Sequence, residues 1–531
     1  MERGPTPALL TRVRLRLAVP PSGLSWLYVG SLATVVGLLV LGAKVHKVLR
    51  IAERVSGGID TNVWPAVLAG DLLFIAAWTG TWLWALHLCG GALKRVTAAA
   101  MHVSTLAVLL LVTCEHAFFL VTGALLDWAL LAYSFEHFAK IKKVIASEMG
   151  LMSWLSLFGA IFIAMAPGVL VQFRRKPATS DRRWSRVGLV TVVGLGAAVV
   201  ALQVAAWSIQ LPNELKPIRG NTVLEHVADA AAALTIGEAQ SDMAVKPVQP
   251  LVVAQTARTK RHNVVLFVLE SVRAQSTTPY NEKLKTTPFL AELAKRGTTV
   301  EHAFTVIPHT TKSLVPIHCG LYPKIVPDFD EATPGALPSD CLARILRRTG
   351  YATHYVQNPE SVFERRRDLV NAFGFHSMRA KEDLPSEGFQ YVGYFGYEDD
   401  VMVKPSLEWV DKQKGPFYMA YLNAVSHHPY EIPKNFPRGK WGAGDKLNKY
   451  YDSIAYTDRF IKKVFEEFDK RGMLDNTLFV LIGDHGEGFG EHGRFQHDQT
   501  IYDEGLRVPL LLVGPGVPKG KRVQGLWQNI Y

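Results

Sequence analysis

Long apolar stretches dominate the first 210 residues of the chain. Each one reaches the roughly 20 residues that an α-helix needs to cross the hydrocarbon core of a membrane. They predict five membrane-spanning helices, at residues 24–43, 63–88, 98–122, 150–172 and 187–207. The first stretch is too long and begins too late for a cleaved signal peptide, and no small-residue cleavage site follows it. We therefore predict that all five helices are retained.

Lysine and arginine residues flank these stretches unevenly. With the N-terminus in the cytoplasm, the cytoplasmic segments hold more of them than the outer loops do, the run at 174–186 above all. An odd number of spans then places everything after Trp207 outside the cytoplasm. Because these basic residues serve as a topology signal, the net charge of +11 does not indicate a nucleic-acid partner, and we predict none.

Ionisable residues lie inside the predicted spans, where an unpaired charge is costly. They are Asp71, His102, Glu115 and His116, with Asp127 just beyond the third span. Two interpretations remain open at this stage. These side chains either pair with one another between helices or take part in function.

The pattern changes after residue 207, where apolar density drops and prolines appear, so we interpret residues 208–261 as a linker. From residue 262, short β-rich runs alternate with longer helical ones, which predicts an α/β domain with a mainly parallel central sheet at 262–531. The clearest strands are 263–269, 417–422, 477–482 and 508–513, and the clearest helices are 287–296, 341–349 and 452–471. Near-continuous apolar runs suit strands that are covered on both faces.

Composition excludes two further classes of protein. Charged residues make up only 20% of the 531 residues and hydrophobic residues 48%, so a wholly soluble protein is not expected. Four cysteines exclude a disulfide-rich scaffold, and their spacing excludes a cysteine zinc module. Cys319 and Cys341 both fall in the exported domain, where an oxidising compartment permits a disulfide, and we predict one between them. Cys89 and Cys114 fall in spans and suit apolar packing.

Polar residues follow two of the predicted strands. Glu270 and Ser271 come directly after strand 263–269, and Asp484 and His485 come shortly after strand 477–482. In open α/β sheets, binding sites form at the carboxyl ends of strands. Carboxylate and imidazole groups are suitable ligands for Mn²⁺, Mg²⁺ or Zn²⁺. Each motif alone is commonly a surface feature, but together they predict a divalent-metal site.

A second candidate is the hydroxyl-rich segment Pro-His-Thr-Thr-Lys-Ser at 308–313. A hydroxyl in the first turn of a helix lies near unpaired backbone N–H groups, which favour developing negative charge. Taken by itself, an ordinary helix N-cap is the better interpretation of this segment.

Four motifs in order resemble the sulfatase and alkaline-phosphatase-like superfamily. They are NVVLFVLES at 263–271, Thr310 and Ser313 ahead of GLYP at 320–323, SHHPY at 426–430 and GDHGE at 483–487. With the spans that precede them, they resemble the lipoteichoic acid synthase group of membrane phosphoglycerol transferases. The resemblance implies Thr310 as nucleophile and Glu270, Thr310, Asp484 and His485 as ligands of one divalent ion, Mn²⁺, Zn²⁺ or Mg²⁺. Glu491, His492 and His497 are either ordinary surface residues or contacts to substrate or to a second ion.

The departures from the family pattern reduce the number of reactions that the resemblance allows. Sulfatases carry Cys or Ser in a C/S-x-P-x-R signature that matures to formylglycine, whereas Thr310 occupies that position here, with Lys312 and Leu314 in place of Pro and Arg. A threonine cannot become formylglycine, so sulfate-ester hydrolysis by that route is not expected. Phosphoglycerol and phosphoethanolamine transferases, which use a metal-bound threonine, are the better match. Thr311 and Ser313 are the rival nucleophiles.

Several positions correspond to substrate-binding residues of the synthase group. His427 matches a substrate-binding histidine, and Arg366 matches a phosphate-contacting arginine, although the run of arginines at 365–367 is equally consistent with a solvated helix face. Gln357 and Glu364 stand where the group has a histidine and a tryptophan. The resemblance therefore does not identify which headgroup is transferred.

The resemblance implies a multi-pass enzyme of the bacterial cytoplasmic membrane with its catalytic domain on the outer side. It would move a phosphoglycerol or phosphoethanolamine headgroup from a membrane phospholipid to an envelope glycan or lipid acceptor, through a phosphothreonine. No obligatory protein partner is indicated. The alternatives are a sulfatase-like phosphodiesterase or sulfuric-ester hydrolase, and a sensor or scaffold with an inactive domain. Because the superfamily usually continues with a strand and a helix beyond 513–517, we expect a truncated C-terminus.

Overall fold

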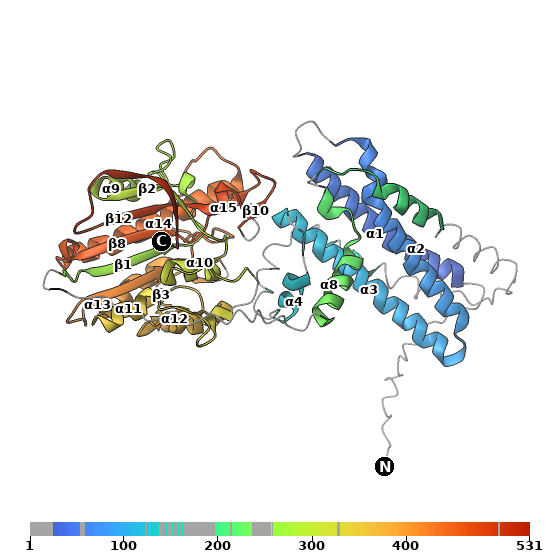
Figure 1. Cartoon of the computed structure of the whole chain (residues 1–531), viewed down its shortest axis with the longest axis horizontal. Helices are drawn as coiled ribbons and strands as arrows, with labels where there is room; N and C mark the ends of the chain where they lie inside the picture. The colour runs from blue at the N-terminus through green and yellow to red at the C-terminus, as the bar shows by residue number, and fades with distance from the viewer. Residues whose placement is uncertain are drawn as a thin grey trace, which may run out of the picture. The chain divides into compact units, whose positions relative to one another are not determined.

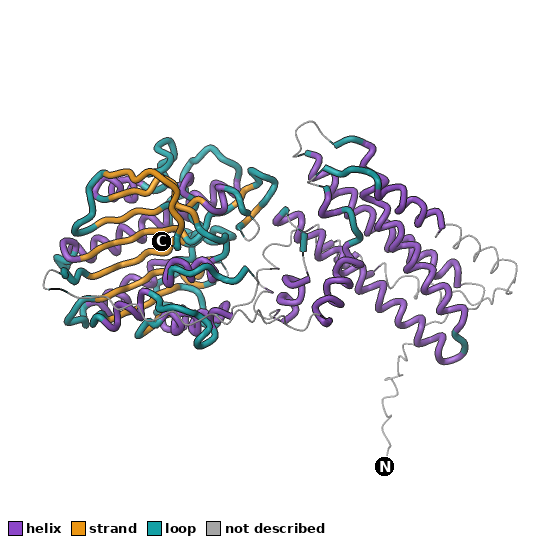
Figure 2. The backbone as a smooth tube through the Cα atoms, in the orientation of Figure 1, coloured by secondary structure: helices purple, strands orange, loops and turns teal. Residues whose placement is uncertain are grey.

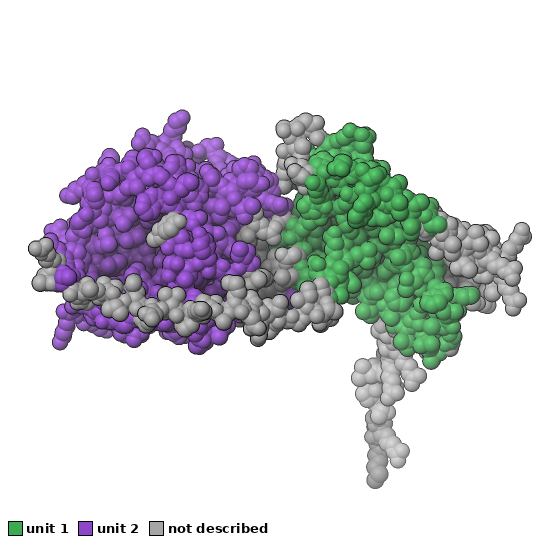
Figure 3. All heavy atoms as spheres, in the orientation of Figure 1, with its two compact units in different colours: residues 1–121, 125–128, 149–238 green, residues 122–124, 129–148, 239–531 purple. Residues whose placement is uncertain are grey.

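The computed structural model describes residues 25–53, 59–123, 128–136, 197–212 and 215–235, and residues 259–530 apart from 326–329, 394 and 498–499, with shorter pieces elsewhere. The chain divides into two compact units (Figure 3). The helical unit comprises residues 1–121, 125–128 and 149–238. The sheet unit comprises residues 122–124, 129–148 and 239–531.

In the described part of the helical unit, three helices are long and apolar enough to cross a membrane (Figure 1). They are α1 (Ser25–Ala52), α2 (Trp64–Leu88) and α3 (Gly91–Thr122), and they confirm the first three predicted apolar helices. The fourth predicted span, 150–172, lies largely outside the described residues. Of the fifth, the apolar helix Ala197–Trp207 is described. A total of five spans therefore stays a prediction.

The ionisable residues inside these helices are paired with one another. Lys44 Nζ on α1 lies 3.2 Å from Asp71 Oδ2 on α2, and the buried Lys47 pairs with Glu115 on α3. Pairing lowers the cost of holding these charges in an apolar environment. His102 and His116 also have partners, Tyr28 and His46 respectively, whereas Asp127 lies outside the described residues. For the four described residues, the structure favours pairing between helices.

Part of the predicted linker belongs to the helical unit. Leu215 and Ile218 are buried in one apolar cluster with Val48 and Val67 of α1 and α2. The chain then continues as α8 (Thr222–Thr235). Residues 236–255 of the predicted linker lie outside the described residues.

The sheet unit is built around a nine-stranded sheet (Figures 1 and 2). Its strands are β1 (Asn263–Leu269), β2 (Thr298–Phe304), β3 (Ala352–Gln357), β4 (Ser377–Arg379), β7 (Phe417–Leu422), β8 (Thr477–Gly483), β11 (Arg507–Val508), β12 (Leu510–Val513) and β13 (Lys521–Gln528). The order is β11-β2-β12-β8-β1-β7-β3-β4, with β13 on β2. Strands β8, β1, β7, β3 and β4 run parallel and β12 antiparallel to β8, so the mainly parallel sheet is confirmed.

Helices cover both faces of this sheet. Along β1, Val265 and Phe267 are buried in one apolar cluster, while Leu266 and Val268 are buried in another. The first cluster includes side chains of α9 (Pro288–Arg296), α13 (Val403–Val410) and α14 (Asp445–Lys470), and the second those of α10 (Thr310–Cys319), α11 (Leu342–Arg348) and α12 (Arg366–Phe373). Two apolar faces explain why the strand sequences are apolar almost without interruption.

The remaining regular elements are short. Among those in the described residues are α4 (Trp128–Glu136), α15 (Asp503–Leu506), several 3-10 turns and two small two-stranded sheets, β5 (Tyr391–Val392) with β6 (Gly396–Tyr397) and β9 (Gly488–Phe489) with β10 (Phe495–Gln496). The predicted strand at 508–513 is divided into β11 and β12 at Pro509, since a proline has no N–H for a strand ladder.

The register of the central strands determines which loops meet. Leu269 at the end of β1 lies opposite Gly483 at the end of β8, and Val268 lies opposite Leu422 at the end of β7. The residues that follow these three strands are therefore neighbours at one edge of the sheet.

Candidate active site

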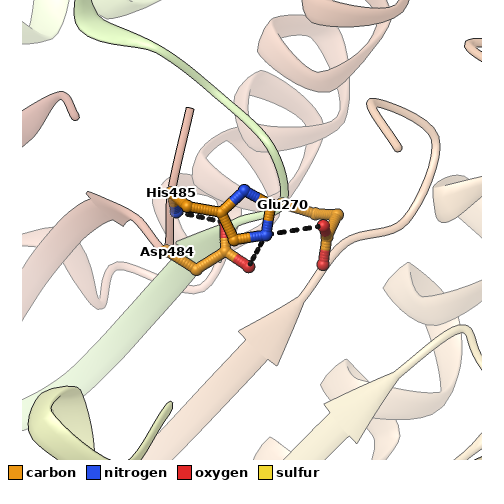
Figure 4. Close-up of side chains that lie close together, drawn as sticks. All are labelled: Glu270, Asp484 and His485. Carbon is orange, nitrogen blue, oxygen red and sulfur yellow. Dashed lines mark hydrogen bonds and ion pairs between the residues drawn. The ribbon is translucent and has the colours of Figure 1, made fainter. Parts of the chain in front are cut away.

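Three acid and imidazole side chains converge at the carboxyl ends of β1 and β8 (Figure 4). His485 Nε2 lies 3.5 Å from Glu270 Oε1 and 3.4 Å from Asp484 Oδ2. All three residues are buried, and one ligand atom from each lies within 4.8 Å of the others. Within the described part of the chain, no other group of three or more such side chains meets this criterion.

Local hydrogen bonds orient these side chains. His485 Nδ1 lies 2.8 Å from the carbonyl oxygen of Gly486, so Nδ1 carries the proton and donates it, and the lone pair of Nε2 faces the two carboxylates. Asp484 Oδ1 accepts the backbone N–H of Ser271 at 2.9 Å and that of His485 at 2.7 Å. The buried Asp484 Oδ2 has no hydrogen-bond partner among the described residues and points into the cluster.

The electrostatics of the cluster are those of a site that needs a cation. Burial and the nearby Asp484 charge raise the pKa of Glu270 well above its usual value. Burial also raises the pKa of Asp484 and lowers that of His485. Two buried carboxylates, an unpartnered carboxylate oxygen and an unprotonated imidazole nitrogen form a donor set that fits a divalent metal ion. Glu270, Asp484 and His485 would hold such an ion.

Thr310 is the hydroxyl that reaches this cluster. It is the first residue of α10, where backbone N–H groups have no partner within the helix. Its Oγ1 donates to Glu270, 3.0 Å from Oε2, and lies 3.2 Å from His485 Nε2. The hydroxyl therefore lies against two of the three predicted metal ligands, at the positive end of the helix dipole.

The two rival hydroxyls point elsewhere. Thr311 Oγ1 donates to Glu364 and accepts from Arg366 Nη2 at 2.8 Å. Ser313 Oγ donates to the carbonyl oxygen of Asp484 at 2.6 Å and is fully buried. Because successive helical residues point about 100° apart, only the first hydroxyl of the segment faces the predicted ligands.

The predicted phosphate-binding arginine contacts Thr311, the residue after the predicted nucleophile. Arg366 begins α12 and is buried, so the alternative of a solvated helix face is wrong for this residue. Its Nη2 donates to Thr311, the neighbour of Thr310, whereas Nε and Nη1 have no hydrogen-bond partner among the described residues. Two unused N–H donors on a buried guanidinium suit the oxygens of a phosphoryl group.

The predicted histidines line the same site. The His497 ring lies 4.2 Å from the His485 ring between centroids, and the His427 ring lies 5.3 Å from that of His497. Burial lowers the pKa of His427 to about 3, so this imidazole is neutral. His497 Nδ1 also approaches Glu487 Oε2 at 3.4 Å.

Glu491 and His492 have structural partners. Glu491 pairs with the buried Arg273, and His492 Nδ1 lies 2.7 Å from Glu504 Oε1. Neither residue belongs to the candidate metal cluster.

Several residues of the site were not recognised in the sequence. Asn423 follows β7 directly, and its Oδ1 accepts the backbone N–H of Glu270 at 2.9 Å. Ser426 Oγ donates to the carbonyl oxygen of Glu270. The buried Asp399 accepts the N–H of Ala424 at 2.9 Å, and burial raises its pKa to about 7. The strand-end rule, extended to 417–422, would have found Asn423, but no local pattern marks Asp399.

A disulfide joins Cys319, the last residue of α10, to Cys341, which directly precedes α11. Cys341 is fully buried in the apolar cluster that also includes Leu314 and Val315 of α10. The bond therefore fixes the C-terminal end of the helix whose first residue is Thr310.

A family model described as Sulfatase matches residues 262–530. The chain belongs to the sulfatase family. Among curated relatives, this sulfatase-family chain is 26% identical over 306 residues to an ulvan-active sulfatase of Formosa agariphila, and 26% identical over 192 residues to lipoteichoic acid synthase 2 of Bacillus subtilis. These matches cover 51% and 34% of this chain, but only 60% and 29% of the relatives' own length.

One solved structure resembles nearly the whole chain. The integral membrane protein lipooligosaccharide phosphoethanolamine transferase A of Neisseria meningitidis aligns with a TM-score of 0.65 over 95% of this chain and 94% of that one, at 14% identity. At this identity the likeness shows the fold alone: apolar N-terminal helices followed by a sulfatase-type sheet domain. The resemblance to the sulfatase and alkaline-phosphatase-like superfamily is therefore confirmed.

Proposed function

We propose that this protein is a membrane-anchored, metal-dependent transferase that moves a phospholipid headgroup, phosphoglycerol or phosphoethanolamine, to an envelope acceptor through a phosphothreonine. Residues 1–207 anchor the enzyme in the bacterial cytoplasmic membrane, and residues 262–531 form its catalytic domain on the outer side. The disulfide between Cys319 and Cys341 suits an oxidising compartment. A donor confined to the bilayer meets a membrane-tethered site at high effective concentration.

The observation that carries the proposal is the place of the Thr310 hydroxyl. It lies 3.2 Å from His485 Nε2 and donates to Glu270, so it completes a set of four ligands while facing the helix N-terminus. A divalent ion, when bound, supplies stabilisation of the threonine alkoxide and polarises a phosphoryl oxygen. Glu270, Asp484 and His485 are buried and held by their own hydrogen bonds, which fixes the geometry before substrate arrives.

In the first step, Thr310 Oγ1 forms a bond to the donor phosphorus and the bond to the diacylglycerol oxygen breaks. The hydrogen bond from Thr310 to Glu270 marks the direction in which the hydroxyl proton leaves. The diacylglycerol oxygen takes up a proton and departs. The two unused donors of Arg366 bind phosphoryl oxygens throughout and hold the phosphorus near Thr310.

In the second step, an acceptor hydroxyl attacks the phosphorus and gives up its proton, while the bond to Thr310 Oγ1 breaks and this oxygen takes up a proton to restore the hydroxyl. His427 and His497, which line the site, contact the headgroup or the incoming hydroxyl. The acceptor is a glycan or lipid of the cell envelope, and no protein partner is required by this chemistry.

Peptide mass spectrometry of the segment that contains Thr310, from full-length protein purified out of native membranes, tests the proposal. We expect a phosphoglycerol or phosphoethanolamine mass on Thr310. An unmodified Thr310 under trapping conditions, together with no headgroup transfer to any acceptor, would show that the proposal is wrong.

A hydrolase of the same superfamily is the second candidate, favoured by the match to an ulvan-active sulfatase. Water would then replace the acceptor in the second step. A threonine at position 310 argues against the formylglycine route to sulfate esters, so a phosphodiesterase is the stronger form of this candidate. Free headgroup or free sulfate in solution, with none on an acceptor, would identify the hydrolase.

A further inference from the structure

Glu364 places a carboxylate beside Thr311, the residue after the candidate nucleophile. It lies in a short 3-10 turn, Phe363–Arg365, that precedes α12. Its carboxylate accepts the hydroxyl hydrogen of Thr311, the neighbour of Thr310, and its Oε1 lies 3.6 Å from His309 Nε2. The side chain is only 12% exposed. A carboxylate this far out of water costs free energy unless a cation meets it.

The backbone that presents Glu364 is strained. Glu364 has φ 49° and Arg365 has φ 52°, two consecutive non-glycine residues in the left-handed region. Such a pair costs on the order of 1 kcal/mol or more per residue, and strain of this kind concentrates at functional sites. The turn directs Glu364 towards the N-terminal end of α10 and leaves the exposed Arg365 facing Asp368.

A series of packed aromatic rings extends from Phe363, the residue before Glu364, to the candidate metal cluster. Phe363 packs edge to face on Phe395 with 4.9 Å between ring centroids, and Phe395 packs in the same way on His427 at 4.5 Å. The rings of His427, His497 and His485 continue the series at 5.3 and 4.2 Å. Phe363 and Phe395 are only partly buried. Partly buried aromatic rings and a carboxylate are the two kinds of group that bind an ammonium group.

Among the described residues, Arg366 is the only permanently charged cation that the structure places against Glu364. This contact is weak. Arg366 Nη2 lies 3.5 Å from Glu364 Oε2 but 2.8 Å from Thr311 Oγ1. Its Nε and Nη1 remain for a phosphoryl group. Occupied by a phosphoryl group, Arg366 has less positive charge to offer Glu364. The site then has the cationic side chain of Arg366 for the phosphate and the anionic side chain of Glu364 for another part of the headgroup.

We propose that Glu364, with the ring pair Phe363 and Phe395, determines donor specificity by binding the cationic amine of an aminoethyl-phosphate headgroup. The inference rests on the proposed function, and it selects a zwitterionic amine-bearing phospholipid over one with a glycerol headgroup. The phosphate contacts Arg366 while the ammonium, two carbons away, contacts Glu364. A headgroup without an amine, such as glycerol, brings the phosphate charge but no cation for Glu364, which disfavours it.

The test measures the reaction of the full-length protein in detergent micelles with three phospholipid donors and compares the donors with one another. They are phosphatidylethanolamine, phosphatidylglycerol and N-acetyl-phosphatidylethanolamine. N-acetylation removes the positive charge of the amine and retains the aminoethyl phosphate. Labelling of Thr310 and release of diacylglycerol are measured for each donor. We expect phosphatidylethanolamine to react with about tenfold higher kcat/KM than either of the two donors that lack a charged amine, which is equivalent to about 1.4 kcal/mol.

Glu364→Gln keeps the shape of the side chain and removes its charge. We expect it to lower kcat/KM for phosphatidylethanolamine about tenfold, while kcat/KM for the N-acetylated donor stays the same or rises. Glu292→Gln, a surface carboxylate on α9 that pairs with Arg296 at 3.3 Å, is the matched control and retains the preference. The comparison of donors with the unmodified protein does not depend on how well any variant folds.

The outcomes separate this inference from the proposed function. A glycerol-phosphate mass on Thr310, or equal reaction of the amine and its N-acetyl form, overturns the role of Glu364 and leaves the transferase proposal standing. No label on Thr310 from any donor, with no diacylglycerol released, overturns both. Loss of reaction with all three donors to the same extent in Glu364→Gln shows a structural role and also overturns the inference.

Discussion

Removing one carboxylate from the candidate metal cluster gives a sharp test of the site. The change Asp484→Asn keeps the size of the side chain and the acceptor that binds the N–H groups of Ser271 and His485, but it removes the charge. Asp484 is fully buried, and its Oδ2 lies 3.4 Å from His485 Nε2 with no hydrogen-bond partner in the described part of the chain. The variant therefore alters both metal binding and the repulsion between two buried carboxylates.

The expected magnitudes follow from linkage. A metal ion at one hundred times its dissociation constant stabilises the folded state by about 2.7 kcal/mol, or roughly hundredfold in the opening equilibrium. Without metal, Asp484→Asn should stabilise the folded state, because the raised pKa values of Glu270 and Asp484 show that two negative charges are unfavourable in the cluster. At about 1.4 kcal/mol per pKa unit, loss of one charge should stabilise the metal-free fold by about 1–3 kcal/mol.

Hydrogen–deuterium exchange of the full-length protein, read on peptides that cover β8 (Thr477–Gly483), measures both effects. We expect Mn²⁺ or Zn²⁺ to slow exchange roughly hundredfold relative to chelator, and Asp484→Asn to abolish most of this response. The metal effect should weaken as pH falls, because protons compete with the ion for Glu270, whose pKa is raised. Asp475→Asn, an exposed carboxylate just before β8, should respond as the unmodified protein does.

Two results would refute this reasoning. An equal metal response in the unmodified protein and Asp484→Asn would mean that the ion binds elsewhere. Faster exchange of metal-free Asp484→Asn than of the metal-free unmodified protein would mean that the two carboxylates do not repel each other in the folded state.

Four further predictions follow from the sheet unit. Thr310→Ala should abolish covalent labelling and turnover, whereas Ser313→Ala should retain most of both; labelling of the alanine variant would move the nucleophile elsewhere. Arg366→Lys should lower kcat/KM about tenfold for every phospholipid donor, since a lysine cannot supply two fixed N–H donors, and an unchanged kcat/KM would exclude a phosphate contact. Cys341→Ser should destabilise the sheet unit by about 3 kcal/mol, measured by urea-dependent proteolysis, through loss of the closed loop; equal resistance with and without reductant would contradict this. Asp399 has a pKa of about 7 in the folded state, above its unfolded value, so the folded state binds this proton more tightly. The free energy of unfolding should therefore fall as pH rises from about 4 to 7, by up to about 1.4 kcal/mol per pH unit. Asp399→Asn should flatten this pH dependence in the same proteolysis assay.

Much of the candidate site could be predicted because its ligands follow strands directly. Glu270 and Asp484 stand at the ends of apolar runs, and parallel strands bring such ends to one edge of a sheet. The same rule, applied to β7, reaches Asn423. It does not reach Glu364, which lies on an irregular turn where neither a period of 2 nor one of 3.6 marks its direction.

The sequence by itself determined the features that depend on local periodicity and length. Apolar stretches longer than the hydrocarbon core is thick gave the three described membrane helices, and apolar runs of six or seven residues gave the central strands. Local pattern did not distinguish the three hydroxyls, and the tertiary structure decided which of them faces the predicted ligands and that Lys44 pairs with Asp71 inside the helical unit. These contacts depend on the rotation of one packed element against another, and a local pattern specifies a buried face but not the side chain that it meets.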